Sequence, residues 1–591
     1  MTARQGVFLF VLLLTAIGTA LLFAAVRLRG ASGSGPAGTL LVFDLPFDLE
    51  EADTPLQPLS LEFRHRNHYR VHEIVEGLRR AAADDHVRGL VVHIDELDWG
   101  WAKAQEIRDA IQRFHDAGKP VYASVVGGSE LEYLIASVAD MVAMPPSATL
   151  ELDGLSASAL FLRGALDKLD VTPNFVQSGV YKSGVEEYTR SGMSPEAREA
   201  LDAVLDSEYR LLVDSLATAR GFDDRDVKRL LDSGPFTADD ARTAGLVDTL
   251  LYDAEVDSLA MDDQTQDVST TSFSRYLARL GARRGGPRIA LITAAGTIMP
   301  GKSRNDPGED LVLGSETMID ALQEARTRNA IKAVVLRIDS PGGSVEASDD
   351  IWREVKRLSD EKPVIVSMSD YAASGGYYIA APAQRIVAQP ASLTGSIGVF
   401  GGKLNVLGLF KKFGLNVETV SRGEHADMMS PYRDFTPEER KRYQRQVDAS
   451  YQLFLSRVVE GRGLGWAEAD SVAQGRVWSG LDAREIGLVD TLGGLETALS
   501  LAYDAGGIAR RDRGSVEVLP RLEHHWYEGL LEGLFEYDDD ALAGRLGLNR
   551  SVVPRGAASI LLSPVVKAWI TASKLRAGIV LALMPYAIEI R

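Results

Sequence analysis

The feature that most constrains this chain is an internal repeat with a period of about 240 residues. The block DARTAGLVDTL begins at Asp240, and DAREIGLVDTL begins at Asp482. Two further matches precede these blocks in the same order: KPV at Lys119 and Lys362, and VVHID at Val91 against VVLRID at Val334. Three matched blocks in one order indicate a tandem duplication of one domain, with a period too long for a solenoid.

Within each half, short β-rich runs alternate with helical stretches. The expected strands are Thr39–Phe43, Gly89–Ile94, Arg288–Thr293, Ala333–Ile338 and Val364–Ser367. The expected helices are Val71–Ala82, Glu316–Arg328 and Ala347–Leu358. This alternation predicts α/β domains built from βα units, with mostly buried parallel strands.

Composition shifts divide the chain into five expected segments. They are a membrane anchor at 1–30, a first α/β repeat at 39–260, a linker at 261–287, a second α/β repeat at 288–510 and a tail at 511–591. The linker contains the polar stretch Asp262–Ser274, which predicts a connection plus a short helix. The apolar tail run Ala577–Ile588 is too short to span a bilayer, so we expect it to pack or to lie at an interface.

The anchor is the uncharged run Gly6–Val26, which at 1.5 Å per residue reaches about 31 Å and can cross a bilayer core. Arg27 and Arg29 follow it directly, which favours an uncleaved anchor over a signal peptide. The charges on the two flanks do not decide its orientation.

Charge and cysteine content exclude several functions. A formal net charge of −19 argues against nucleic acid as a partner, because phosphate binding needs clustered basic residues. With 0 cysteines, no disulfide, thiolate metal site or cysteine nucleophile is possible. His65, His68 and His72 lie among arginines that repel a cation, so we expect no metal and no cofactor.

Two loops of the second half have the form of catalytic loops. Asp339–Ser344 (DSPGGS) follows an expected strand and can present backbone N–H groups as an oxyanion hole, although Pro-Gly-Gly is also an ordinary turn. In Tyr371–Tyr378 (YAASGGYY), Ser374 lies between a strand and a helix with small neighbours that let a carbonyl approach. From this loop alone, Ser374 is equally well a helix N-cap.

A nucleophilic serine needs a base, and His425 is one candidate. Comparison of the halves gives another, because Gly179–Lys182 aligns with Gly423–Ala426, so that a lysine stands where the second half has alanine. The first half lacks the Pro-Gly-Gly turn, and Ser129, its best counterpart of Ser374, is followed by Glu-Leu instead of Gly-Gly. Each half keeps a different part of the machinery, so we expect the site where the halves meet.

The stretches SPGGS, AASGGYY, LTGSIGVFG (Leu393–Gly401), GVYKS (Gly179–Ser183) and the two GLVD blocks resemble the signal peptide peptidase A family, in its long, duplicated, membrane-anchored form. The resemblance covers about residues 39–505. It implies a fold like those of Clp protease and crotonase, with repeated ββα units. It also implies that Ser374 is the nucleophile, Lys182 the general base, Ser396 the hydroxyl that orients the lysine, and Gly343 and Gly375 the oxyanion donors.

The same resemblance implies the setting of the reaction. The family cleaves signal peptides left in the membrane after secretion, and its members assemble into homo-oligomers, here expected to be tetramers. We therefore expect peptide substrates, contact with membrane lipid through the N-terminal helix, and a single-pass protein of the bacterial inner membrane with its catalytic domains on the periplasmic side.

Lysine is a base only when its pKa is strongly perturbed. Free lysine has a pKa of about 10.4, so well under about 1% is neutral at pH 7. Burial disfavours the ammonium and can lower the pKa by roughly 3–5 units. We expect Val180, Tyr181 and an assembly that excludes water to supply this burial of Lys182.

Other readings of the same residues remain. A crotonase-like acyl-CoA enzyme also uses two backbone N–H groups as an oxyanion hole, and an inactive oligomeric membrane scaffold would keep only the fold. Asp248 and Asp490 recur in both halves, which indicates a role in the fold, such as capping or pairing with Arg242 and Arg484.

Overall fold

The computed structural model describes residues 38–51, 69–264, 268–280, 286–305, 311–509, 516–520, 580–584 and 589–590. The expected anchor, His65, His68 and most of the tail lie outside these ranges. Within them, no helix has both the length and the apolar character needed to cross a membrane.

The first half is an α/β unit around a parallel sheet with strand order β10-β5-β3-β2-β1-β11. Its strands are β1 (Gly38–Asp44), β2 (Val87–Ile94), β3 (Val121–Val125), β5 (Met141–Met144), β10 (Thr249–Leu250) and β11 (Val268–Ser272). Its main helices are α2 (Val71–Ala82), α3 (Trp101–Asp116), α4 (Glu130–Ala136), α7 (Pro195–Arg220), α10 (Asp253–Asp262) and α11 (Phe273–Arg279). Helix α2 has the bounds that the sequence predicts.

The second half repeats this arrangement in the order β22-β18-β17-β15-β12-β23, and its strand β17 also pairs with β19, which pairs with β21. Its strands are β12 (Arg288–Ala295), β15 (Ile331–Ser340), β17 (Val364–Ala373), β18 (Arg385–Ala388), β19 (Leu393–Gly395), β21 (Val477–Ser479), β22 (Thr491–Leu492) and β23 (Val516–Leu519). Its main helices are α12 (Ser315–Thr327), α13 (Val345–Glu361), α14 (Gly375–Ala380), α16 (Pro437–Arg462) and α19 (Leu495–Ala505). The expected alternation of buried strands and helices is confirmed in both halves.

The shorter elements complete the two units. They are β4 (Gly128–Ser129), β6 (Thr149–Glu151), β7 (Ala157–Ser158), α5 (Arg163–Lys168), the 3₁₀ helix η1 (Ser183–Val185), α6 (Glu186–Thr189), α8 (Asp224–Leu231), β9 (Phe236–Thr237), α9 (Ala238–Thr243), α15 (Leu407–Lys412), α17 (Trp466–Val472), α18 (Gly480–Glu485) and β25 (Glu589–Ile590).

The duplication extends to the signals that start and end the long helices. Ser194 and Thr436 cap α7 and α16 through their hydroxyls, a proline follows each cap, and Gly221 and Gly463 end the helices in the left-handed conformation. The carboxylates of Asp248 and Asp490 accept from backbone N–H groups of β5 and β18. The fold role expected for these aspartates is therefore present.

The expected arginine partners of these aspartates were wrong. Arg220 and Arg462, from the last turns of the long helices, pair with Asp248 and Asp490 at 2.7 and 2.8 Å. Arg242 instead pairs with Asp239 in its own helix, at a spacing of three residues. The correct partners are remote in sequence and become neighbours only when the long helix packs on the sheet.

Two segments outside the expected repeat belong to the sheets. Val268–Ser272, inside the expected linker, forms β11 and pairs in parallel with β1. Val516–Leu519, beyond the expected end of the second repeat, forms β23 and pairs in parallel with β12. The two strands are counterparts at the same edge of each sheet, so the duplication continues to residue 519.

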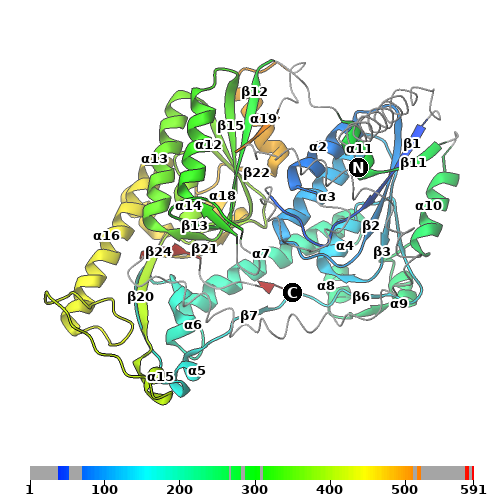
Figure 1. The fold of residues 1–591 in the computed structure, drawn as a ribbon. Helices are drawn as coiled ribbons and strands as arrows, with labels where there is room; N and C mark the ends of the chain where they lie inside the picture. The colour runs from blue at the N-terminus through cyan, green and yellow to red at the C-terminus, as the bar shows by residue number, and fades with distance from the viewer. Residues whose placement is uncertain are drawn as a thin grey trace, which may run out of the picture.

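A third sheet joins the halves, with the order β14-β13-β16-β24-β20-β8. It contains β8 (Thr172–Ser178), β13 (Thr297–Met299), β14 (Val312–Gly314), β16 (Gly342–Ser344), β20 (Val399–Asn405) and β24 (Val580–Leu583). Figure 1 shows the cyan segment with β8, α5 and α6 leaving the first half and lying beside the yellow-green β20 and α15. Because β8 pairs antiparallel with β20, the residues that follow β8 in sequence lie against the second half.

Buried ion pairs also hold the halves together. Arg337 of β15 is 1% exposed and donates to the carboxylates of Glu51 and Glu106 from the first half, at 2.7 and 2.8 Å. Removing one member of such a group leaves buried charge uncompensated, at a cost of about 3–5 kcal/mol. The relative position of the halves is therefore strongly specified.

Candidate active site

Ser374 lies in the turn between β17 and α14 and is 0% exposed. Its φ of +56° is a conformation that non-glycine residues rarely adopt. Its N–H donates to the carbonyl of Gly395 at 2.8 Å, and its hydroxyl makes no helix-capping bond. The strained turn therefore directs the hydroxyl away from the helix.

Its counterpart Ser129 is the last residue of β4 and directly precedes α4 in the first half, with an ordinary extended backbone. Ser129 forms a capping box with Glu132, whose carboxylate accepts from both the N–H and the hydroxyl of Ser129 at 2.8 Å. The helix-capping role that the sequence left open for Ser374 is therefore filled by its counterpart Ser129, whereas the hydroxyl of Ser374 makes no capping bond.

Lys182 follows β8 and reaches the Ser374 turn within the same chain. Its Nζ lies 2.7 Å from Oγ of Ser374, and 2.8 and 2.9 Å from the carbonyl oxygen and Oγ of Ser396. All three side chains are buried. The structure brings together the lysine predicted from the first half and both serines predicted from the second.

Burial holds the pKa of the Lys182 amine well below its ordinary value, and no carboxylate of the described chain opposes this effect. The backbone of the second half provides the enclosure. A Cβ on Gly475, which has a φ of +81°, would lie 2.5 Å from N of Lys182, and one on Gly398 would lie 3.0 Å from its Cδ. Val180 was wrongly expected to contribute, because it is 60% exposed.

Gly398 and Gly475 were not recognised from the sequence. Gly398 belongs to the TGSIG stretch that contains Ser396, but this motif alone does not show that Gly398 packs against the side chain of Lys182. Gly475 stands in a loop before β21, and only its contact with a residue about 290 positions away reveals why glycine is needed.

Gly343 and Gly375, the predicted oxyanion donors, lie against each other. A Cβ on Gly375 would be 3.0 Å from N of Gly343, and a Cβ on Gly343 would be 2.0 Å from the carbonyl oxygen of Ile298. Glycine at both positions is therefore needed for this close approach. Within DSPGGS, Asp339 and Ser340 end β15 and Gly342–Ser344 form the short strand β16, where the sequence predicts a turn.

His425, the alternative base, lies in the loop before α16. Its Nδ1 is 3.6 Å from a carboxylate oxygen of Glu439, which also pairs with Arg433. The group that contacts the Ser374 hydroxyl is the amine of Lys182.

A second, largely buried lysine supports the loops of the site, and no motif of the sequence indicates it. Lys103, in α3 of the first half, contacts Asp339 at 2.7 Å and Asp370 at 3.3 Å. Asp339 is the first residue of DSPGGS, and its carboxylate accepts a hydrogen bond from the N–H of Tyr371. One carboxylate therefore links both loops. Burial alone would lower the pKa of Lys103, but the two carboxylates raise it above its ordinary value.

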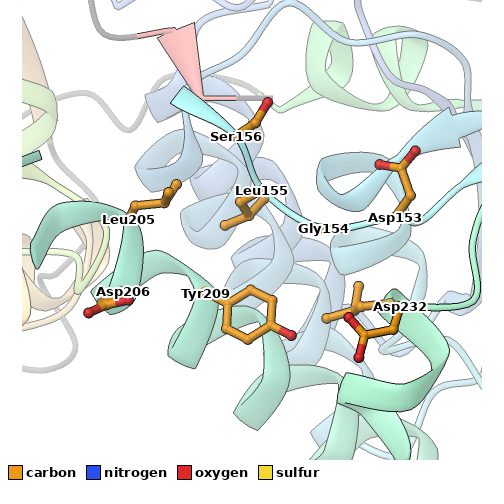
Figure 2. A pocket seen from close by; sticks show the side chains of 9 residues that line it. Asp153, Gly154, Leu155, Ser156, Leu205, Asp206, Tyr209 and Asp232 are labelled. Carbon is orange, nitrogen blue, oxygen red and sulfur yellow. The ribbon is translucent and has the colours of Figure 1, made fainter. Parts of the chain in front are cut away.

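The cavity in Figure 2 lies elsewhere, between the loop before β7 and helices α7 and α8 of the first half. Asp153, Ser156, Asp206, Tyr209 and Asp232 are among its lining residues, and neither Ser374 nor Lys182 is. At the Ser374 site, the space beside β16 is filled by β24.

A buried serine in a strained turn, contacted by a buried lysine of lowered pKa and flanked by closely packed glycines, is the equipment of a serine hydrolase of the Ser–Lys type. Sequence comparison agrees and narrows the class to serine proteases. The model of Peptidase family S49 matches residues 113–267 and 356–508, one match in each half, and the chain belongs to this family.

Two relatives cover most of the chain. The chloroplastic serine protease SPPA of Arabidopsis thaliana is 35% identical over 474 residues, covering 78% of this chain and 69% of the relative. Protease 4 of Salmonella typhi is 31% identical over 511 residues, covering 84% and 79%. The resemblance to the signal peptide peptidase A family is thus confirmed, and the chain is a serine protease of mixed α/β fold with duplicated domains.

Among solved structures, a ClpP1 variant from Listeria monocytogenes is 15% identical with a TM-score of 0.23, covering 36% of this chain and 94% of that chain.

Proposed function

We propose that this protease cleaves peptides with Ser374 as nucleophile and Lys182 as general base. The observation that carries the proposal is the 2.7 Å contact between Nζ of Lys182 and Oγ of Ser374, both fully buried. A neutral amine has two N–H donors and one lone pair. The two oxygens of Ser396 take the donors, which leaves the lone pair for the hydroxyl proton of Ser374.

In this mechanism Lys182 accepts the hydroxyl proton as Oγ of Ser374 bonds to the substrate carbonyl carbon. The N–H groups of Gly343 and Gly375 stabilise the oxyanion that forms. Collapse of the tetrahedral intermediate breaks the peptide C–N bond, and the lysine returns the proton to the leaving amine. A water molecule, deprotonated by the same amine, then hydrolyses the acyl-serine ester.

Ser374→Ala tests the nucleophile. It should abolish hydrolysis of a fluorogenic apolar peptide and labelling by a serine-reactive phosphonate, without unfolding the chain. Ser129→Ala is the matched control, because it removes the counterpart hydroxyl: it should keep activity and lose about 1 kcal/mol of stability as a helix cap. Wild-type turnover in Ser374→Ala would reject the assignment. An acyl-CoA enzyme or an inactive scaffold would not be labelled at Ser374.

We further propose that Gly6–Val26 anchors the protein in the bacterial inner membrane as a single span, with the catalytic domains on the periplasmic side and signal peptides among the substrates. The uncharged run supports the anchor, and a relative named as a putative signal peptide peptidase from Enterococcus faecium supports the substrate class. Carbonate-resistant membrane association and digestion by protease added to spheroplasts are expected. Extraction by carbonate would reject the anchor, and protection in intact spheroplasts would reject the orientation.

We also propose a homo-oligomer, expected to be a tetramer. Strand β8 of the first half pairs with β20, whereas the corresponding segment near Leu415–Val420 forms no strand in the structure. It exposes Phe413 at 75%, Leu415 at 52% and Val420 at 85%. An unpaired apolar segment of this kind suits a neighbouring copy. Mass photometry should find an oligomer that Val420→Asp weakens, and a monomeric wild type would overturn the proposal.

A further inference from the structure

The loop before β21 packs against the loop that contains Lys182. We call residues Gln474–Arg476 the clasp and residues Gly179–Lys182 the lysine loop. A Cβ on Gly179 would lie 2.6 Å from the carbonyl carbon of Gln474, and the N–H of Tyr181 donates to the carbonyl oxygen of Gln474 at 2.8 Å. Together with the close approach of Gly475 to Lys182, these contacts place the two backbones directly against each other.

The clasp also holds Ser396, whose carbonyl and hydroxyl oxygens accept from the amine of Lys182. The N–H of Ser396 donates to the carbonyl of Arg476 at 2.6 Å. Gln474 anchors the clasp in the second half, because its side-chain amide donates to the carboxylate of Asp470 at 2.8 Å. One short segment therefore fixes both the lysine and the serine that orients it.

The side chain of Arg476 joins the two halves at this point. Its guanidinium carbon lies 5.2 Å from the centre of the Tyr181 ring and 4.4 Å from that of the Trp478 ring. Its Nη1 lies 2.6 Å from a carboxylate oxygen of Glu199 in α7, and the other oxygen of Glu199 accepts from the hydroxyl of Tyr181 at 3.2 Å. Tyr181, the residue directly before Lys182, is thus held by its backbone, its ring and its hydroxyl.

The duplication shows that this pair of charges diverged together with the lysine. Counted from the caps of α7 and α16, Lys441 stands in the second half where the first half has Glu199. The segment before β9, which corresponds to the clasp, reads Ser-Gly-Pro at 233–235 and contains no arginine. Lys182, Glu199 and Arg476 therefore meet at one junction between the halves, and their counterparts keep neither the amine nor the pair.

We propose that Arg476 is a positioning residue, which holds the lysine loop against the clasp through Tyr181 and Glu199. In this position Nζ of Lys182 stays within hydrogen-bond distance of the Ser374 hydroxyl, and the clasp excludes water from the amine. The inference rests on the proposed function, because the position of the amine affects turnover only if the amine is the base. A catalytic group displaced by about 1 Å can cost about 100-fold in rate.

Displacement of the lysine loop should also change the pH dependence of the reaction. The titratable side chains that hold the loop and the clasp are those of Tyr181, Glu199, Tyr451, Asp470 and Arg476. None of them opposes or adds to the lowered pKa of the Lys182 amine, which burial alone causes. Water that reaches the amine should therefore move this pKa back towards its ordinary value, so that the rising limb of kcat/KM lies at higher pH.

Arg476→Met tests the positioning role, because it keeps the aliphatic stem and removes the guanidinium. At pH 7, kcat for a fluorogenic peptide should fall about 100-fold with KM unchanged, and the rising limb should move to higher pH. Arg113→Met is the matched control, because Arg113 of α3 pairs with Glu496 of α19 across the halves at the same 2.6 Å. The control should keep the wild-type kcat and limb. A wild-type kcat in Arg476→Met, or a lower kcat with an unshifted limb, would overturn the proposal.

An exchange of charges separates positioning from damage to the fold. Arg476→Glu places two carboxylates together and should lose more activity than Arg476→Met. Addition of Glu199→Arg restores an ion pair of reversed direction, which should recover about tenfold in kcat and return the limb towards that of wild type. Melting temperatures are measured in parallel. Failure of kcat and the limb to recover in the double variant, whatever its melting temperature, would reject the positioning role.

The proposed function and this inference fail in different ways. If Lys182 is not the base, Lys182→Met stays active. If Arg476 does not position the lysine, Lys182→Met is inactive while Arg476→Met keeps the wild-type kcat and rising limb.

Discussion

The interface between the halves contains two lysines, Lys103 and Lys182, in different surroundings. Both come from the first half, and both amines are buried among residues of the second half. The amine of Lys103 contacts Asp339 and Asp370, whereas among the described residues that of Lys182 contacts the hydroxyl oxygen of Ser374 and the hydroxyl and carbonyl oxygens of Ser396. The pKa of Lys103 is raised and that of Lys182 is lowered.

Burial alone disfavours the ammonium at both sites, so the partners decide the protonation state. Two carboxylates keep Lys103 charged, and it acts as a structural tie between the loops that carry Gly343 and Ser374. Neutral oxygens leave the desolvation of Lys182 unopposed, so its pKa is lowered, as the proposed role of general base requires. The duplicated fold therefore uses one residue type for two purposes, separated by the charge of the neighbouring side chains.

The largest expected effect comes from Lys182→Met, which keeps the stem and removes the amine. Peptide hydrolysis should fall by several orders of magnitude, because within the part of the chain that the structure describes the basic group in contact with the Ser374 hydroxyl is the amine of Lys182. Thermal stability at pH 7 should not fall, since folding no longer has to neutralise a lysine. Turnover is measured with a fluorogenic peptide and stability by thermal unfolding. Turnover within tenfold of wild type would refute the assignment.

A carboxylate beside Lys182 should raise the pKa of its amine, so that it becomes charged like that of Lys103. Ser396→Asp suits this test because Ser396 has a φ of +49°, which aspartate tolerates better than most residues. An opposite charge at this distance raises a lysine pKa by about 1–3 units, so activity at neutral pH should fall roughly 10- to 1000-fold and recover as the pH rises. Ser396→Asn is the neutral control.

The pH profile of kcat/KM separates the two explanations for a weak Ser396→Asp variant. In the wild type the rising limb reports loss of the Lys182 proton, and in Ser396→Asp this limb should lie at higher pH. Loss of activity with an unshifted limb would mean that the aspartate damages the site without charging the lysine. A wild-type profile that is flat from pH 5 to 9 would contradict the lysine mechanism itself.

The sequence anticipated the meeting of Lys182 with Ser374 because the two halves can be compared with each other. Lysine against alanine in one alignment, and Gly-Gly against Glu-Leu in another, are local differences that one sequence displays. Helix α2 could also be predicted, since the spacing of its apolar residues and the residues that flank it are local features of the sequence. The fold class and the candidate site could both be predicted because they depend on patterns that are local in the sequence.

The features that the sequence did not reveal depend on contacts between distant segments. Strand β11 reads VSTTS, a polar edge strand whose pairing with β1 leaves no periodic apolar pattern. Lys103 and Arg337 look like ordinary surface residues until the halves pack. Strand β24 is an apolar run like many others, and only its neighbours β16 and β20 give it meaning.

Lys103→Met makes the same substitution at the second lysine of the interface, so its effect on stability can be compared directly with that of Lys182→Met. It leaves Asp339 and Asp370 facing each other without a counter-charge, which should cost about 3 kcal/mol of folding stability. Lys103→Met/Asp370→Asn removes one carboxylate and should recover part of the loss. Urea unfolding of both variants beside Lys182→Met provides the measurement, and equal stability of the two lysine variants would mean that Lys103 does not stabilise the fold through its carboxylate partners.

The last expected effect concerns a buried acid that, like Lys182, has no oppositely charged partner among the described residues. Glu208 of α7 is 2% exposed, and burial, followed by repulsion from Asp370, raises its pKa to about 8. The ordinary value is 4.5. Between these values the folded chain holds a proton that the unfolded chain releases, so stability falls as the pH rises through this window and levels off above it.

Glu208→Gln should remove this loss, because the amide stays neutral at every pH. Relative to wild type, its melting temperature should be similar near pH 4.5, should rise through the window, and should stay above that of wild type at pH 9. Asp202→Asn, an exposed acid-to-amide change on the same helix, is the control and should show no such trend. A pH-independent difference between Glu208→Gln and wild type would mean that Glu208 is ionised in the fold. Partners alone would then not decide the charge of buried groups at this interface.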